Sequence, residues 1–292
     1  MKVMKVLVFA DSNWSVGRVH KDIERYLIDT EFTYVNWTGF DWTDLVQKFV
    51  ECDVCLTNIV SIKFLRDTGI PFDFKKCIFM SHGYPDNKAT DIERLTDEWV
   101  YGITSESIRP LFPENRTIFV MPNGVEPSHF QYTERSGSIK TLGWCGSQDI
   151  KTKQPEWAHE ISNQVSVPIS FASVLSFSEV CSWYSTIDIL LVTAIPDNSS
   201  ETGPLPAFES IVSGVLVIGT PVGNFKNVPG PKFNSIEEAV QIIEDLKSNP
   251  AKVRQLAREQ YEYVMEHCTY SSFAWKWQEA LEYVNLRSKR IE

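Results

Sequence analysis

The sequence has no apolar run long enough to cross a membrane. A transmembrane helix needs about 20 consecutive apolar residues, and no segment of the 292 residues approaches that length. The apolar run at the N-terminus is too short for the core of a secretory signal, and no small-residue cleavage pattern follows it. We therefore expect a cytoplasmic protein without a transmembrane segment.

Positive charge is also scarce. The chain has 28 lysines and arginines against 38 aspartates and glutamates, which gives a formal net charge of -10. Proteins that bind nucleic acid normally present a basic face, and strong adhesion to anionic lipid requires clustered cations. The only basic cluster, at 287–290, is typical of a solvated helix end. The composition predicts no nucleic-acid partner and gives no information on the oligomeric state.

Metal and redox motifs are few. The sequence contains no Asp-x-Asp motif, and its five histidines are scattered. Cys52 and Cys55 form a Cys-x-x-Cys, but zinc would need a second pair. Redox pairs of this kind lie at a helix start, whereas this one falls between a helix and a strand. Six cysteines without a secretory signal indicate reduced thiols, and we expect neither a metal ion nor a bound cofactor.

Short apolar strands alternate with helices along the whole chain. In the first half we expect strands at 2–10, 32–37, 54–58, 77–81, 99–104 and 117–121, with helices at 19–28, 42–50, 61–68, 91–96 and 106–112. In the second half we expect strands at 140–144, 168–172, 189–193 and 215–219, with helices at 155–164, 178–185, 206–213, 235–247, 250–268 and 272–288. This alternation predicts an α/β protein with parallel, doubly wound sheets.

A turn-rich segment divides these elements into two groups. Pro-Asn-Gly-Val at 122–125 precedes a polar stretch, and such composition is typical of a domain boundary. We predict an N-terminal Rossmann-like domain at 1–125, a second Rossmann-like domain at 126–271, and a final helix at 272–292.

The stretch 188–225 combines structural and chemical signals. A buried strand is followed by a polar loop and by Gly203-Pro204-Leu205-Pro206, where proline suits the first turn of a helix. Gly214 would end that helix in the left-handed conformation. Open α/β sheets bind ligands at the carboxyl ends of their strands, and a helix start favours phosphate.

Two glutamates mark this loop. Glu201 and Glu209 have seven residues between them, and the segment Ser-Gly-Val-Leu-Val-Ile-Gly-Thr-Pro-Val-Gly follows. This stretch resembles the donor site of family-four GT-B retaining glycosyltransferases (glycosyl transferases group 1), and 121–126 resembles their interdomain turn. The resemblance is dense at 121–224 and thin before it. It implies a GT-B fold, in which two Rossmann-like domains face a cleft and the last helix crosses back to the N-terminal domain.

The resemblance implies roles for residues of the second domain. Lys153, or Lys151 in its place, would bind the donor diphosphate after the turn at Gly146. Glu209 would hold the ribose hydroxyls, because a carboxylate accepts two hydrogen bonds from a vicinal diol. Glu201 would lie beside the donor sugar and the reacting centre. The remaining donor-binding positions are the backbone of Gly203 and Leu205, together with Gly223.

In the first domain the resemblance points to fewer residues. His82 follows the fourth strand and matches a position that contacts the donor sugar or the reacting region. Gly17, in the first strand–helix loop, matches a glycine turn against the phosphate. Apart from the resemblance, the nine tryptophans include one in the first loop, Trp14, that is a candidate for stacking on a carbohydrate acceptor. Two positions depart from the family pattern: Ser147 replaces an arginine, and Pro204 replaces a glycine and has no N–H.

The sequence therefore predicts a retaining, metal-independent glycosyltransferase of the hexosyltransferase type. It would move a sugar from a nucleotide-diphosphate donor to a hydroxyl of a carbohydrate or other acceptor. Two alternatives stay open: a sugar-nucleotide epimerase on the same scaffold, and a non-catalytic sugar-nucleotide-binding protein. The nucleotide base, which we expect near 173–177, and the donor sugar are not readable from the sequence.

Overall fold

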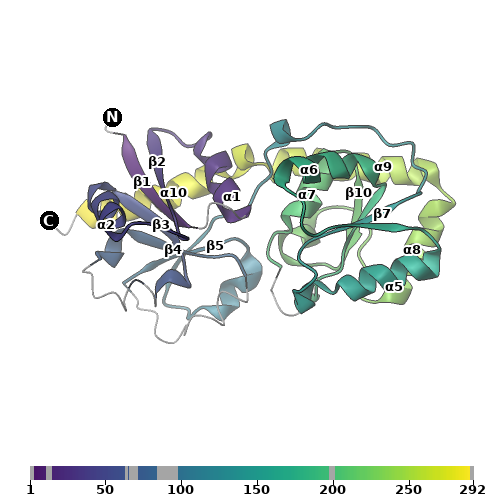
Figure 1. Ribbon diagram of the computed structural model, residues 1–292, viewed down its shortest axis with the longest axis horizontal. Coiled ribbons are helices and arrows are strands. Elements are labelled where there is room, and N and C mark those ends of the chain that lie inside the picture. The colour runs from purple at the N-terminus through teal and green to yellow at the C-terminus, as the bar shows by residue number, and fades with distance from the viewer. Residues whose placement is uncertain are drawn as a thin grey trace. The chain divides into compact units, whose positions relative to one another are not determined.

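Apolar strands covered on both faces build two separate parallel sheets. The computed structural model describes residues 3–10, 15–62, 65, 72–83, 98–196 and 201–289. The chain divides into two compact units, Met1–Asn123 with Tyr270–Glu292, and Gly124–Thr269 (Figure 1). These divisions lie two residues from the boundaries expected at 125 and 271.

The first unit has a six-stranded sheet in the order β2-β1-β3-β4-β5-β6. All of its described pairings are parallel, as the buried, nearly continuous apolar strands predict. The strands are β1 (Met4–Ala10), β2 (Thr30–Asn36), β3 (Val54–Asn58), β4 (Cys77–Ser81), β5 (Val100–Ile103) and β6 (Thr117–Val120).

The helices of this unit include one from the far end of the chain. They are α1 (Ser15–Glu24), α2 (Trp42–Glu51), the short 3-10 helices η1 (Phe74–Lys76) and η3 (Glu106–Leu111), and α10 (Tyr270–Lys289). On α10, the buried face includes Trp277, whose indole N–H donates to the Pro122 carbonyl at 3.1 Å. The last helix is thereby joined to the segment that follows β6, and it also packs against α1 and η1 of the same unit.

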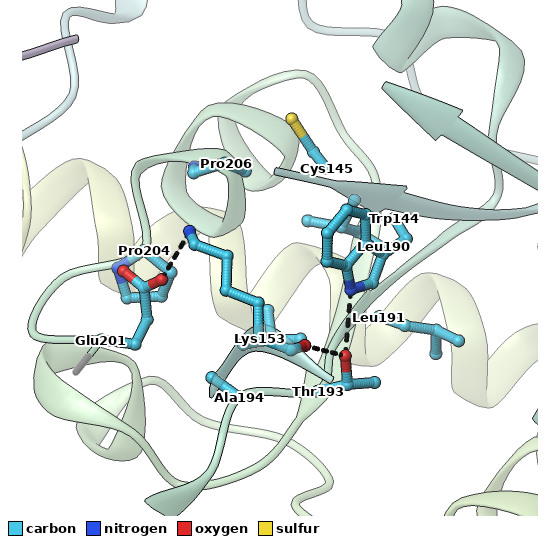
Figure 2. A pocket seen from close by; sticks show the side chains of 11 residues that line it. Trp144, Cys145, Lys153, Leu190, Leu191, Thr193, Ala194, Glu201, Pro204 and Pro206 are labelled. Carbon is cyan, nitrogen blue, oxygen red and sulfur yellow. Dashed lines mark hydrogen bonds and ion pairs between the residues drawn. The ribbon is translucent and has the colours of Figure 1, made fainter. Parts of the chain in front are cut away.

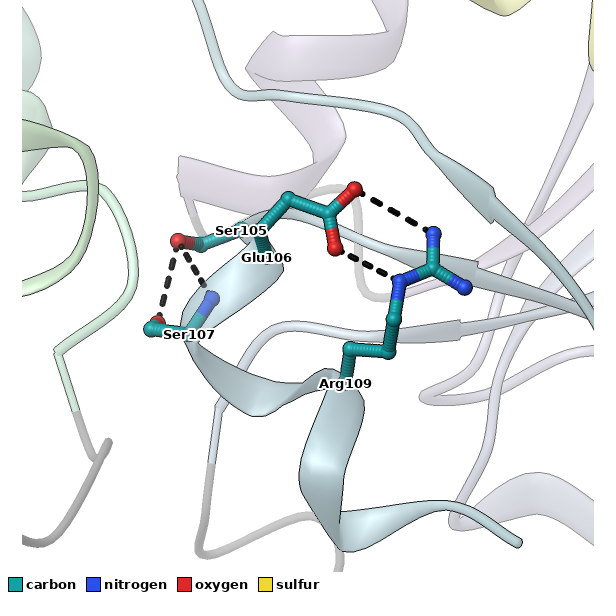
Figure 3. A network of polar contacts seen from close by, with 4 residues as sticks. All are labelled: Ser105, Glu106, Ser107 and Arg109. Atoms are coloured by element: carbon teal, nitrogen blue, oxygen red, sulfur yellow. Dashed lines mark hydrogen bonds and ion pairs between the residues drawn. The ribbon is translucent and has the colours of Figure 1, made fainter. Parts of the chain in front are cut away.

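Two expected helices of the first unit need correction. The first was expected at 19–28 but begins at Ser15. The segment expected as a helix at 106–112 is the 3-10 helix η3, which contains Pro110. Its start is fixed by Ser105, whose hydroxyl oxygen accepts from the Ser107 amide at 3.2 Å, as Figure 3 shows. The helix expected at 91–96, and most of that at 61–68, lie outside the described residues.

The 3-10 helix η3 also carries an ion pair between Arg109 and Glu106. The Arg109 guanidinium donates to both carboxylate oxygens of Glu106, at 2.6 and 3.3 Å (Figure 3). These hydrogen bonds hold the pKa of Glu106 below its usual value. The pair spans one turn of η3 on an exposed face, where such contacts stabilise a helix only slightly.

The second unit has a four-stranded parallel sheet in the order β10-β9-β7-β8. Its strands are β7 (Leu142–Cys145), β8 (Ile169–Ala172), β9 (Ile189–Val192) and β10 (Leu216–Gly219). Its helices are α5 (Pro155–Val165), α6 (Phe177–Trp183), α7 (Leu205–Val212), α8 (Ile236–Lys247) and α9 (Pro250–His267). Helices α5 and α8 cover one face of the sheet, and α6 and α7 lie on the other (Figure 1). Helix α9 runs along the edge strand β10, where the Gln260 side chain bonds the Val217 backbone, and its Val253 packs in the same apolar cluster as α5 and α8.

The end of α7 confirms one local prediction. Gly214 has a φ of +86° directly after the C-cap residue Ser213. A Cβ at this position would lie 2.2 Å from the carbonyl oxygen of Thr133. Glycine is therefore required both for the left-handed closing conformation and for the close approach of a second chain segment.

Candidate functional site

The candidate site lies where β7 and β9 end in the second unit. These strands are neighbours in the sheet, so the loops that follow them meet at its carboxyl edge. The loop after β7 turns at Gly146 and continues into the 3-10 helix η5 (Lys151–Lys153). A Cβ on Gly146 would lie 3.1 Å from Cδ of Lys153, so the lysine stem passes directly over the glycine.

The backbone of Lys153 is tied to the core of the unit. The Thr193 hydroxyl, at the end of β9, donates to the Lys153 carbonyl at 2.7 Å. It also accepts from the indole N–H of Trp144 at 2.9 Å. Trp144 and Thr193 are 2% and 1% exposed, so this chain of hydrogen bonds is shielded from water and fixes the lysine (Figure 2).

The Lys153 side chain points at Glu201. Its ammonium group lies 2.8 Å from Oε2 of the glutamate, and the two side chains are 26% and 16% exposed (Figure 2). The carboxylate raises the pKa of Lys153, which therefore carries its charge at neutral pH. Lys151 is exposed and is not among the residues that line the small cavity beside this ion pair.

A small cavity adjoins the ion pair. Its volume is about 20 Å³, which is about the room that one water molecule needs. Its walls include Trp144, Cys145, Pro204 and Pro206. A fixed cation and a carboxylate thus meet at the rim of an otherwise largely apolar pocket.

Helix α7 begins beside this cavity. Pro204 is its N-cap residue and provides no side-chain cap. The first amides of a helix have no acceptor within the helix. Pro206 has no N–H and the Ala207 amide donates to the Pro204 carbonyl at 2.8 Å, so Leu205 supplies the amide of this first turn, and Gly203 lies just before the N-cap. Both residues are buried. The positive end of the α7 dipole lies close to the Lys153–Glu201 pair and would favour an anion.

Glu209 is more deeply placed than the sequence indicates. It lies one turn inside α7 and is 4% exposed. Its Oε2 accepts a hydrogen bond from the Tyr184 hydroxyl at 2.8 Å. Sequence reasoning missed Tyr184, because nothing in the pattern links positions 25 residues apart on different helices.

Gly223 lies where two loops of the second unit approach each other closely. Its φ is +44°, and a Cβ would lie 2.1 Å from the Thr202 carbonyl oxygen. The next residue, Asn224, donates its amide to the same carbonyl at 2.8 Å. Gly223 therefore lets the turn after β10 pack against the loop that carries Glu201.

The site residues predicted in the first unit are His82, Gly17 and Trp14. His82 directly follows β4 and is half-buried. Gly17 lies within the first turn of α1, not in the expected loop, because the helix begins at Ser15. It is buried and packs as part of the helix. Trp14 lies outside the described residues.

In the ranges that the structure describes, no three histidine, cysteine, aspartate or glutamate side chains come together in a group that could hold a metal ion. Within the same ranges, no helix is both long enough and apolar enough to traverse a bilayer.

Comparison with known proteins gives the fold. No protein-family model matches the chain, and no curated protein matches it. Among solved structures, Anabaena HepE (Alr3699) in complex with UDP and glucose superposes with a TM-score of 0.69 at 11% identity, over 96% of this chain and 100% of that chain. AviGT4, a glycosyltransferase involved in avilamycin A biosynthesis, gives 0.63 at 11% identity, over 97% and 98%.

A third similar structure is an alpha-glucosyltransferase in complex with UDP and a 13-mer DNA containing an HMU base. It gives a TM-score of 0.65 at 12% identity, over 97% of this chain and 100% of that chain. These likenesses confirm the predicted GT-B fold. Membership of family four and the roles of individual residues stay predictions.

Proposed function

We propose that the protein is a glycosyltransferase that uses a nucleoside-diphosphate sugar as its donor. The observation that carries the proposal is the Lys153–Glu201 pair, 2.8 Å apart at the carboxyl edge of the second sheet and close to the start of α7. The similar GT-B structures support it, because HepE is described with UDP-glucose and the alpha-glucosyltransferase with UDP.

The chemistry of the reaction fits these groups. Breaking a sugar–phosphate bond leaves negative charge on the departing diphosphate. A preorganised cation and helix-start amides stabilise such charge without reorganising in the transition state. We assign the cation to Lys153, whose backbone is fixed through Thr193 and Trp144, and the amides to Gly203 and Leu205.

The two glutamates would bind different parts of the donor. Glu209 would accept hydrogen bonds from the ribose hydroxyls, and Glu201 would lie at the donor sugar next to the phosphate that Lys153 holds. His82 of the first unit would contact the donor sugar or the reacting region. The first unit would bind the acceptor, which would be a carbohydrate or another hydroxyl compound.

We further propose that the reaction retains the anomeric configuration and needs no metal ion. In such a reaction the acceptor hydroxyl attacks from the face that the nucleotide leaves, and the leaving phosphate takes the proton. The net charge of -10 favours an acceptor other than nucleic acid.

The products of a donor and acceptor panel test the proposal. The protein is incubated with nucleotide sugars, with and without carbohydrate acceptors, and the products are identified by mass spectrometry and NMR. We expect free nucleoside diphosphate and a glycosylated acceptor with the anomeric configuration of the donor. An epimerised donor formed without acceptor would identify an epimerase instead. Donor binding with no turnover on any acceptor would indicate a non-catalytic binder.

A further inference from the structure

Tyr184 makes a buried hydrogen bond to a proposed donor-binding residue. The tyrosine is 0% exposed, and its hydroxyl donates to Oε2 of Glu209, which is 4% exposed, at 2.8 Å. A carboxylate buried this deeply costs free energy unless it is hydrogen-bonded. The Tyr184 hydroxyl supplies one of the hydrogen bonds that the buried carboxylate needs, and it restricts the rotation of the carboxylate.

Tyr184 is itself held at its main chain and at its ring. It opens the 3-10 turn η6 (Tyr184–Thr186) directly after α6. The Arg135 guanidinium donates to the carbonyls of Tyr184 and Ser185, each at 2.9 Å. The tyrosine ring packs against Phe130 and Trp183, with centroid distances of 6.1 and 5.4 Å. A hydroxyl anchored in this way cannot follow a carboxylate that moves, so it defines one position for it.

The backbone of Glu209 is fixed from the other side. The Ser213 hydroxyl donates to the Glu209 carbonyl at 2.8 Å, and the Ser213 amide donates to the same oxygen at 3.2 Å. With the main chain set by α7 and one carboxylate oxygen bonded to Tyr184, the Glu209 side chain is restrained at both ends. A carboxylate has about four acceptor sites, and the Tyr184 hydroxyl occupies one of them.

We propose that Tyr184 positions Glu209 for the donor ribose and thereby determines the preference for ribonucleotides over deoxyribonucleotides. The inference rests on the proposed function, because it needs a nucleotide donor at this site. Tyr184 acts only through Glu209 and does not touch the donor. A residue with a packing role alone would affect all nucleotides equally.

The test compares nucleoside diphosphates with and without the ribose 2′-hydroxyl. Calorimetry measures the binding of UDP, ADP and GDP and of their 2′-deoxy forms to the wild type and to Tyr184→Phe, which keeps the ring. We expect the variant to bind the ribonucleotide about five- to tenfold more weakly, and the deoxy form, which keeps only the 3′-hydroxyl, at most about threefold more weakly. Equal losses for both forms, or no loss for either, would overturn the inference.

The matched control is Tyr132→Phe, which removes the hydroxyl of an exposed tyrosine of the same unit. We expect it to change neither affinity. If the wild type binds none of the nucleoside diphosphates, the proposed function fails and this inference fails with it. If the wild type binds nucleoside diphosphates and Tyr184→Phe keeps the same ribose preference, only the role of Tyr184 is rejected, and the proposed function stands.

A double-mutant cycle separates positioning from loss of stability. In a Glu209→Ala background both carboxylate oxygens are gone, so Tyr184→Phe should cause no further change in the ribose-to-deoxyribose affinity ratio. The same added loss in that background would show that the hydroxyl acts independently of Glu209 and would contradict the proposal. Thermal unfolding of all four proteins confirms that each is folded at the binding temperature.

Discussion

Lys153 and Lys151 lie two positions apart but in different surroundings. Lys153 is half-buried and bonded to Glu201, whereas Lys151 is exposed. We expect Lys153→Ala to lower kcat/KM by about a hundredfold, as the removal of one preorganised donor typically does. Lys151→Ala should cost less than about threefold. Initial rates at matched donor concentrations decide between them, and a larger loss for Lys151→Ala would assign the diphosphate contact to the other lysine.

The cysteines allow a second test on single residues. Burial raises the pKa of Cys52 and of Cys268 to about 12. The thiolate is the reactive form, and at pH 8.5 both thiols stay protonated in the folded protein. Cys145 and Cys181 are half-buried. We expect iodoacetamide to label this second pair first.

Mass spectrometry of tryptic peptides reports the order of labelling. Protein unfolded in guanidinium chloride, where the ordinary thiol pKa returns, should label at all six cysteines with similar rates. Fast labelling of Cys52 in the folded protein would contradict its burial and would reopen the redox interpretation of the Cys-x-x-Cys.

At the scale of elements, α10 has a buried and an exposed face. Leu281 is 0% exposed and Leu286 is 58% exposed on the same helix. Leu281→Ala should destabilise the protein by about 2–5 kcal/mol through the cavity it leaves. Leu286→Ala should stay within about 0.5 kcal/mol of the wild type. Thermal unfolding measures both, and equal midpoints for the two variants would mean that α10 is not packed as described.

The strands were the most predictable elements. The ranges expected for β3 and β4 coincide with Val54–Asn58 and Cys77–Ser81, because continuous apolar residues between polar neighbours define a strand buried on both faces. The start of α1 was missed because Ser15 and Gly17 are typical loop residues, and the apolar periodicity begins only after them. The 3-10 form of η3 depends on the cap at Ser105 and on Pro110, and apolar spacing reports neither.

The candidate site was predictable only in part. A motif resemblance picked out Glu201, Glu209 and Lys153. The contact between Lys153 and Glu201 spans 48 residues and exists because β7 pairs with β9, an order that the sequence does not reveal. The Tyr184–Glu209 bond joins helices α6–η6 and α7 in the same way. Side-chain pairs of this kind depend on strand order and helix packing, which no local pattern encodes.

At the scale of the whole molecule, the chain returns to its first unit at the end. Residues 270–292 belong to the same compact unit as 1–123, while 124–269 form the other. The connecting turn is bonded within its own unit, where the Val125 amide donates to the Cys268 carbonyl at 2.9 Å. The segment that leaves the first unit and the segment that re-enters it are therefore adjacent.

The central claim is that the second unit binds a nucleoside-diphosphate sugar through Glu209 and Lys153. A thermal-shift screen of the whole protein against a panel of nucleotide sugars tests it most directly, because a ligand of the folded state raises the unfolding midpoint. We predict that one group of donors sharing a base raises the midpoint by several degrees, and that Glu209→Ala abolishes the shift. No shift with any nucleotide sugar, or the same shift in Glu209→Ala, would contradict the account.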